Sequence, residues 1–147
     1  MTETCHLREI LLVEDDSVDV MIVRRVLRDL AVTNKLVHVT DGYQALAHLK
    51  GQDHETPCVI LLDLNMPRMT GIEFLETVKA DEALKGIPVV VVTTSEEQQD
   101  VTRSFELGAT AYVFKSSDYG EFRQEIRTIE RYLASVRPPA PLEMAPS

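Results

Sequence analysis

The sequence predicts a doubly wound α/β domain, in which helices cover both faces of a parallel β-sheet. Three observations lead to this fold class. Short apolar runs alternate with longer amphipathic stretches, so that the order reads strand then helix five times over. The apolar runs are rich in branched residues and mostly lack polar–apolar alternation, which is typical of strands buried on both faces. A chain of 147 residues is long enough for one such domain with its own core.

The predicted strands are residues 10–13, 36–39, 59–62, 89–92 and 111–114. Between and after them, apolar residues recur at helical spacing. Examples are Val20, Val23, Leu27 and Leu30, then Ile72, Leu75 and Val78, and near the end Phe122, Ile126, Ile129 and Leu133. Residues 95–98 and 118–121 have the pattern of capping boxes, and Gly108 suits a helix end.

The boundaries of this domain follow from composition. Residues 1–8 are expected to form an N-terminal tail and residues 9–136 the domain. Residues 137–147 contain four prolines, which cannot continue a helix, so we expect a mobile tail there. We expect no second domain after the fifth helix.

The net charge of −9 argues against nucleic acid as a direct partner, because phosphate backbones repel an acidic protein. No apolar run approaches the ~20 residues that span a bilayer, so we expect no membrane association. The N-terminus lacks the apolar segment of a signal peptide. The two cysteines, Cys5 and Cys58, form no CxxC motif and are expected to be reduced thiols of a cytoplasmic protein.

Polar residues follow four of the five predicted strands. Ligands of an open parallel sheet bind beyond the carboxyl ends of its strands, so these residues are the candidates for chemistry. The first strand leads into Glu14, Asp15 and Asp16, and the third into Asp63, Leu64 and Asn65. Thr93 follows the fourth strand and Lys115 the fifth. We therefore expect carboxylates, a hydroxyl and an ammonium to converge on one edge.

This set of groups favours phosphoryl chemistry with a hard cation. Clustered carboxylates repel and must protonate or share a cation, and ligand sets made only of oxygen suit Mg²⁺. An aspartate beside Mg²⁺ can attack phosphorus as a nucleophile, while the metal and an ammonium stabilise the transferring charge. Each residue also has an ordinary structural role: Asp16 or Thr93 as a helix cap, Asp63 as a turn residue and Lys115 as a surface lysine. If all four residues had only these structural roles, their occurrence at four strand ends would require four unrelated coincidences.

At this point the sequence resembles the receiver domains of bacterial two-component response regulators, of the CheY-like kind. The resemblance extends from about residue 9 to residue 136. It rests on residues 13–16 as the acidic segment, residues 62–71 as the phosphoacceptor loop, residues 92–94 as the switch-hydroxyl segment and residues 108–115, which end in the lysine. The fold implied is flavodoxin-like, with strand order 2-1-3-4-5 and five helices.

The resemblance also implies roles for particular residues. Asp63 would be the phosphorylated aspartate, and Lys115 and Thr93 would hold the phosphoryl oxygens. Mg²⁺ would be bound by Asp16 directly, by Asp15 through water, by Asp63 and by the backbone carbonyl of Asn65. Tyr112 would change rotamer when Thr93 moves. Receivers take the phosphoryl group from a histidine kinase and catalyse only their own phosphorylation and dephosphorylation, so a distinct enzymatic activity is not expected.

One position departs from the family pattern. Ser116 follows Lys115, where the family usually has proline. In this feature, in the spacing of residues 14–19 and in the sequence of residues 89–95, the chain resembles the small single-domain regulators that serve bacterial and cyanobacterial phytochromes. A phytochrome-type histidine kinase is therefore the candidate partner. Because a non-proline cis bond costs about 2.5–4 kcal/mol, we expect the Lys115–Ser116 bond to be trans.

Two other functions stay open from the sequence. The first is a phosphohydrolase with an aspartyl nucleophile, which usually needs an acid/base group two positions after that aspartate, where Asn65 has no titrating proton. The second is a receiver-like interaction module that never takes phosphate.

We also expect a homodimer through the face built by the fourth helix, the fifth strand and the fifth helix. The last amphipathic stretch carries Ile126, Ile129, Tyr132 and Leu133, more apolar surface than one sheet face needs to cover. The alternative is that all four residues simply reach the core.

Overall fold

The computed structural model describes residues 8–51 and 55–130. Its sheet has five parallel strands in the order β2-β1-β3-β4-β5, which confirms the predicted fold class and strand order. The strands are β1 (Ile10–Val13), β2 (Leu36–Val39), β3 (Val59–Leu62), β4 (Val89–Thr93) and β5 (Ala111–Phe114). All five were predicted from apolar runs, and only β4 extends one residue further, through Thr93.

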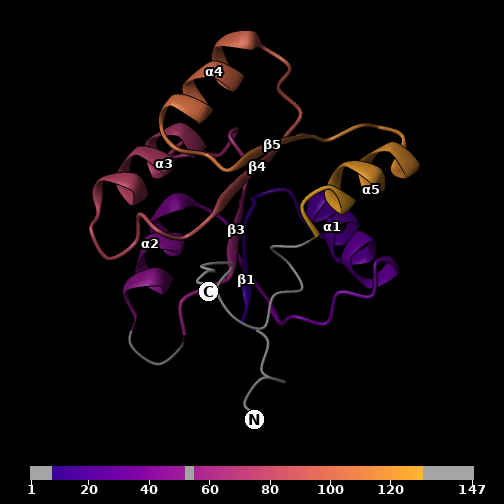
Figure 1. Cartoon of the computed structure of the whole chain (residues 1–147), viewed down its shortest axis with the longest axis horizontal. Coiled ribbons are helices and arrows are strands. Elements are labelled where there is room, and N and C mark those ends of the chain that lie inside the picture. Colours follow the sequence, from indigo (N-terminus) through magenta and orange to yellow (C-terminus); the bar gives the residue numbers. More distant parts are fainter. Residues whose placement is uncertain (1–7, 52–54, 131–147) are drawn as a thin grey trace, which may run out of the picture.

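Five helices cover the two faces of the sheet. They are α1 (Ser17–Asp29), α2 (Gly42–Lys50), α3 (Gly71–Ala80), α4 (Gln98–Glu106) and α5 (Tyr119–Arg127). Figure 1 shows α1 and α5 on one side of the sheet and α2, α3 and α4 on the other. In this sheet β2 lies on one side of β1 and the later strands lie on the other, so the strand order reverses between β1 and β3. Ligands of such sheets bind between the carboxyl ends of these two strands.

The core consists of two clusters, one on each face of the sheet. The strands alternate their side chains between the clusters, so that Ile10 and Leu12 of β1 pack toward α1 and α5, whereas Leu11 and Val13 pack toward α2 and α3. Every residue of β1, β3 and β4 is buried, as expected for strands covered on both faces. The edge strand β2 is half-buried throughout.

The helix ends agree only partly with the predicted caps. Gly108 follows α4 with a φ of 103°, a left-handed conformation that suits glycine. Asp118 caps α5 by accepting a hydrogen bond from the Glu121 N–H, but the Glu121 carboxylate binds the Ser116 hydroxyl and does not complete a capping box.

The capping box predicted at residues 95–98 is wrong. Helix α4 begins at Gln98, and its N-cap, Glu97, makes no side-chain capping bond. The Ser95 hydroxyl donates to the Asp100 carboxylate at 2.6 Å and accepts from the Glu97 N–H at 3.3 Å, so it braces the loop before the helix. The prediction failed because the helix starts later than the capping pattern requires.

The chain after β5 tests two further expectations. No cis peptide bond occurs among the described residues, so the Lys115–Ser116 bond is trans, as predicted. Ile126 and Ile129 are 0% and 3% exposed and belong to the core, so these two residues supply no surface for a dimer. Tyr132, Leu133, the expected tail at residues 137–147 and Cys5 lie outside the described residues. Within the described part of the chain, each helix is too short or too polar to cross a bilayer.

Candidate functional site

Polar side chains lie together at the carboxyl edge of the sheet, as predicted from the sequence. Glu14 follows β1 directly and Asp63 follows β3, and the Asp63 N–H donates to the Val13 carbonyl at 3.0 Å. Thr93 ends β4, and Lys115 follows β5 with its N–H donating to the Thr93 carbonyl at 2.7 Å. Because the strands are parallel and in register, residues far apart in the sequence meet at one edge.

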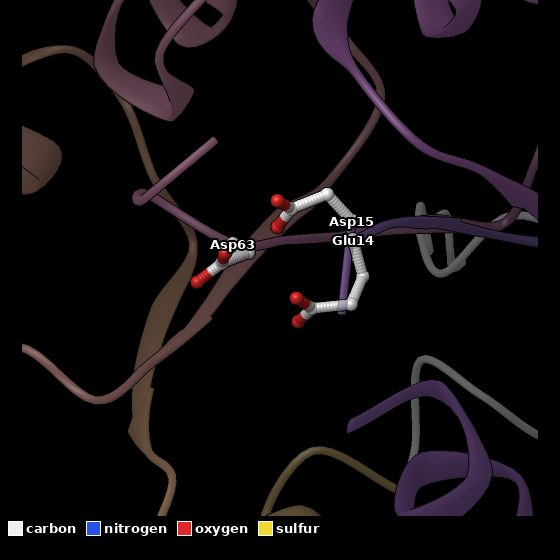
Figure 2. Close-up of side chains that lie close together, drawn as sticks. All are labelled: Glu14, Asp15 and Asp63. Atoms are coloured by element: carbon white, nitrogen blue, oxygen red, sulfur yellow. The ribbon is translucent and has the colours of Figure 1, made fainter. Parts of the chain in front are cut away.

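Three carboxylates form a cluster at this edge. Glu14, Asp15 and Asp63 each offer an oxygen, and these oxygens lie within 4.8 Å of one another. Figure 2 shows the three side chains close together, Glu14 and Asp15 from the end of β1 and Asp63 from the end of β3. Glu14 and Asp63 are 2% and 5% exposed, whereas Asp15 is open to solvent. The cluster is therefore buried on one side and accessible on the other.

Lys115 is the cation of the site. Its Nζ lies 2.5 Å from Glu14 Oε1, 2.8 Å from Asp19 Oδ2 and 3.5 Å from Asp63 Oδ1. The lysine side chain is only 10% exposed, so these interactions operate in a largely desolvated place. One ammonium thus faces three carboxylates, and it contacts Asp63 less closely than the other two.

Burial and charge shift the pKa values of these groups. Burial raises the pKa of Glu14 to about 7, although Lys115 acts in the opposite direction. Burial also raises the pKa of Asp63, and again Lys115 opposes the shift. Burial alone would lower the pKa of Lys115, but its hydrogen bonds to Asp19 and Glu14 raise the pKa above the ordinary value. The raised pKa values of Glu14 and Asp63 show that these buried carboxylates are costly to keep charged, so the cluster must take up protons or share a further cation.

Asp16, expected from the resemblance as a direct metal ligand, lies apart from the carboxylate cluster. It is the N-cap of α1, and its Oδ1 accepts hydrogen bonds from the N–H groups of Val18 at 2.8 Å and Asp19 at 3.2 Å. The position one residue before a helix directs a short acidic side chain at the free backbone N–H groups of the first turn. The geometry places Glu14, in place of Asp16, beside Asp15 and Asp63.

The loop after β3 is packed closely against neighbouring elements. Asn65 is exposed two residues after Asp63, and a backbone hydrogen bond from Asn65 helps to keep the Asp63 carboxyl ionised. A Cβ on Gly71 would overlap the Asp63 carbonyl and lie 2.6 Å from Leu64 Cα, so only glycine lets α3 begin so near the site. Arg68, with a φ of 66°, pairs with the buried Asp41 carboxylate at the start of α2.

Thr93 and Tyr112 are linked through one residue of the loop after β4. The fully buried Thr93 accepts a hydrogen bond on Oγ1 from the Ser95 N–H at 3.3 Å. The half-buried Tyr112 donates its hydroxyl to the Ser95 carbonyl at 2.9 Å. A movement of the Thr93 hydroxyl would therefore affect Ser95, the residue whose carbonyl also holds the Tyr112 hydroxyl.

The donor set fits a hard divalent cation. All three clustered groups are carboxylates, and no histidine or cysteine joins them among the described residues. Mg²⁺ typically uses one or two carboxylates and keeps several waters, which the exposed side of Asp15 allows.

Sequence reasoning missed two features of this site. Glu14 was quoted in the acidic segment but not assigned to the metal, although it is the first residue beyond the buried strand. Asp19 was not assigned at all, and its signal was its position in the first turn of the helix that follows the acidic segment.

Comparison with known proteins agrees with the fold. Residues 10–127 match the family described as response regulator receiver domain. The response regulator Rcp1 of Synechocystis is 40% identical over 136 residues, which cover 89% of this chain and 92% of Rcp1.

Solved structures give the same result. A crystal structure of the Mn²⁺-bound form of Rcp1 has a TM-score of 0.80 at 38% identity, over 90% of this chain and 99% of that one. The phosphorylated cyanobacterial phytochrome response regulator RcpA has a TM-score of 0.79 at 34% identity, over 91% and 99% of the two chains. The chain therefore belongs to the response regulator receiver domain family and is homologous to phytochrome response regulators.

Proposed function

We propose that this chain is a phosphorylation switch in two-component signalling, with Asp63 as its phosphoacceptor and a histidine kinase as its phosphodonor. The observation that carries the proposal is the position of the Asp63 carboxylate. It lies at the end of a buried strand, 3.5 Å from the Lys115 ammonium and within 4.8 Å of two further carboxylates. This arrangement offers a nucleophilic oxygen, a cation to stabilise charge on the transferred group and a place for a metal.

Mg²⁺ is the proposed cofactor, and the residues that would hold it are Asp15, Asp63 and Glu14, together with the Asn65 carbonyl. When bound, the ion neutralises the clustered carboxylates and stabilises negative charge on the phosphoryl oxygens. The supporting observation is the all-carboxylate cluster with its solvent-open side. Asp16 is left out of this set because its carboxylate caps α1.

The residues of the chain perform the remaining steps. An Asp63 oxygen attacks phosphorus, and the bond from phosphorus to the imidazole nitrogen of the kinase histidine breaks, leaving the electron pair on that nitrogen. Lys115 and the Thr93 hydroxyl then donate hydrogen bonds to the phosphoryl oxygens. Hydrolysis of the resulting acyl phosphate returns the switch to its resting state. We propose no catalytic activity beyond these reactions of the chain on itself.

The proposed partner is a histidine kinase of the phytochrome type. Support comes from the similarity to RcpA, whose structure is described as that of a phytochrome response regulator. Direct binding of nucleic acid is not part of the proposal, because the net charge is −9. The cytoplasmic location and the absence of membrane association stay predictions from the sequence.

Self-association through α4, β5 and α5 also stays a prediction, with less support than the sequence alone gave it. Ile126 and Ile129 pack into the core, but Phe105 on α4 is 47% exposed and supplies some apolar surface on this face. Light scattering at high protein concentration measures the mass, and a single-chain mass would contradict a dimer.

The test of the phosphoacceptor uses acetyl phosphate as a small phosphodonor. We expect labelling of the wild-type chain that requires Mg²⁺ and is lost in Asp63→Asn, which keeps the size of the side chain but removes the nucleophilic charge. Asp100→Asn is a matched control, because Asp100 lies on α4 and binds the Ser95 hydroxyl. Mass spectrometry would locate the added phosphoryl group.

Two results would contradict the proposal. Full labelling of Asp63→Asn would move the phosphoacceptor to another residue. A wild-type chain that takes no phosphate from acetyl phosphate or from candidate kinases would instead favour the phosphate-independent interaction module.

A further inference from the structure

We propose that Asp19 is a positioning residue for Lys115, holding its ammonium so that one N–H is directed at the phosphoacceptor. This inference rests on the proposed function, because it concerns how Lys115 is presented to Asp63. Asp19 lies in the first turn of α1, outside the carboxylate cluster.

The contacts of Lys115 account for two of its three N–H donors. One donates to Glu14 at 2.5 Å and another to Asp19 at 2.8 Å. These acceptors come from two different elements, the end of β1 and the first turn of α1, so together they fix the direction of the Nζ atom. The third N–H is left for Asp63, whose oxygen lies at 3.5 Å, beyond a normal hydrogen bond, and it is free to donate to an oxygen of a phosphoryl group carried by Asp63.

The space around Lys115 shows why a second acceptor matters. A cavity of about 260 Å³ lies beside the lysine, and its lining includes Asp19, Lys115, Ser116 and Phe122. Without the Asp19 carboxylate, the flexible lysine side chain has room to turn into this cavity and away from Asp63. Glu14 alone holds the ammonium at one point, which leaves its direction free.

An acidic residue in the first turn of a helix also has an ordinary role, because it interacts favourably with the helix dipole. That role does not require contact with Lys115. The Asp19 carboxylate nevertheless lies against the ammonium and is only 29% exposed, so the helix dipole alone does not explain its orientation.

The experiment compares Asp19→Ala and Asp19→Asn with the wild type in labelling by acetyl phosphate at saturating Mg²⁺. We expect Asp19→Ala to lower the maximal rate by roughly tenfold, the effect of losing about one charge-assisted hydrogen bond, with the half-saturating donor concentration unchanged. Asp19→Asn keeps an acceptor oxygen and should lose less. Asp29→Ala is the matched control, because Asp29 is on the same helix and binds Tyr119.

A second readout follows Lys115 itself by ¹⁵N NMR of its ammonium group. We expect a slowly exchanging signal in the wild type and in Asp29→Ala, and a broadened or lost signal in folded Asp19→Ala. A wild-type rate together with an unchanged ammonium signal in Asp19→Ala would overturn the inference. A wild-type chain that is not labelled would contradict the proposed function, while the ammonium signal would still decide whether Asp19 holds Lys115.

Discussion

Helices α3 and α4 lie next to each other on the same face of the sheet but are attached to it very differently. Gly71, Phe74, Leu75 and Val78 of α3 are buried, and α3 begins with a complete capping box between Thr70 and Glu73. Helix α4 buries only Ser104, whose hydroxyl lacks a hydrogen-bond partner among the described residues, and its N-cap makes no side-chain bond. The loop after β3, which carries the proposed phosphoacceptor Asp63, leads into the firmly held helix α3, and Thr93 leads into the weakly held helix α4.

This difference indicates that α3 and α4 have different roles in the domain. Asp63 has to stay in place for chemistry, and the close contact between Gly71 and the Asp63 backbone keeps it there. Elements that respond to a signal belong to the less stable part of a structure, since little free energy is needed to move them. By this reasoning α4 and the loop before it are the responding part, and the predictions about α4 below test that contrast.

The largest expected effect is the difference in stability loss between alanine substitutions of two phenylalanines, one on α3 and one on α4. Phe74 on α3 is fully buried, so Phe74→Ala should lower the free energy of unfolding by about 3–5 kcal/mol. Phe105 on α4 is 47% exposed, so Phe105→Ala should change it by only about 0.5 kcal/mol. Urea unfolding followed by circular dichroism measures both. Equal losses would show that α4 is held as firmly as α3.

A smaller difference in stability loss is expected between substitutions of two helix N-caps, those of α1 and α4. Asp16→Ala removes a carboxylate that accepts two backbone hydrogen bonds and should cost about 1 kcal/mol of unfolding free energy. Glu97→Ala removes no capping bond from α4 and should cost less than about 0.5 kcal/mol.

The same Asp16 variant tests the composition of the metal site. By calorimetric titration, Asp16→Ala should keep nearly wild-type affinity for Mg²⁺, whereas Asp15→Ala should bind it much more weakly. Loss of Mg²⁺ binding in Asp16→Ala would show that Asp16 is a metal ligand after all.

Much of this architecture could be predicted from the sequence, because it depends on local patterns. Branched apolar runs such as Val59–Leu62 report burial on both faces, and the alternation of strands and helices restricts the topology to very few arrangements. The convergence of Asp63, Thr93 and Lys115 on one edge followed from the parallel strands alone.

The remaining features depend on side-chain direction, which spacing does not determine. The sequence shows three acidic residues in a row, but only the structure shows that Asp16 turns to the helix backbone and Glu14 turns to Lys115. Likewise, residues 95–98 match a capping box, yet α4 starts at Gln98 and the Ser95 hydroxyl binds Asp100. The buried positions of Ile126 and Ile129 also depended on where α5 meets the sheet.

The central claim is that phosphorylation of Asp63 acts on α4 through Thr93, and backbone NMR with beryllofluoride as a phosphoryl mimic tests it most directly. A ligand on Asp63 should draw the Thr93 hydroxyl away from the Ser95 N–H, and so disturb Ser95, the residue whose carbonyl holds the Tyr112 hydroxyl. We predict large shift changes in α4 and the loop before it, and smaller ones in α3. In Thr93→Ala, which keeps Asp63 and Lys115, the mimic should still bind but the α4 changes should be lost. A full wild-type pattern of α4 shifts in Thr93→Ala would contradict the account.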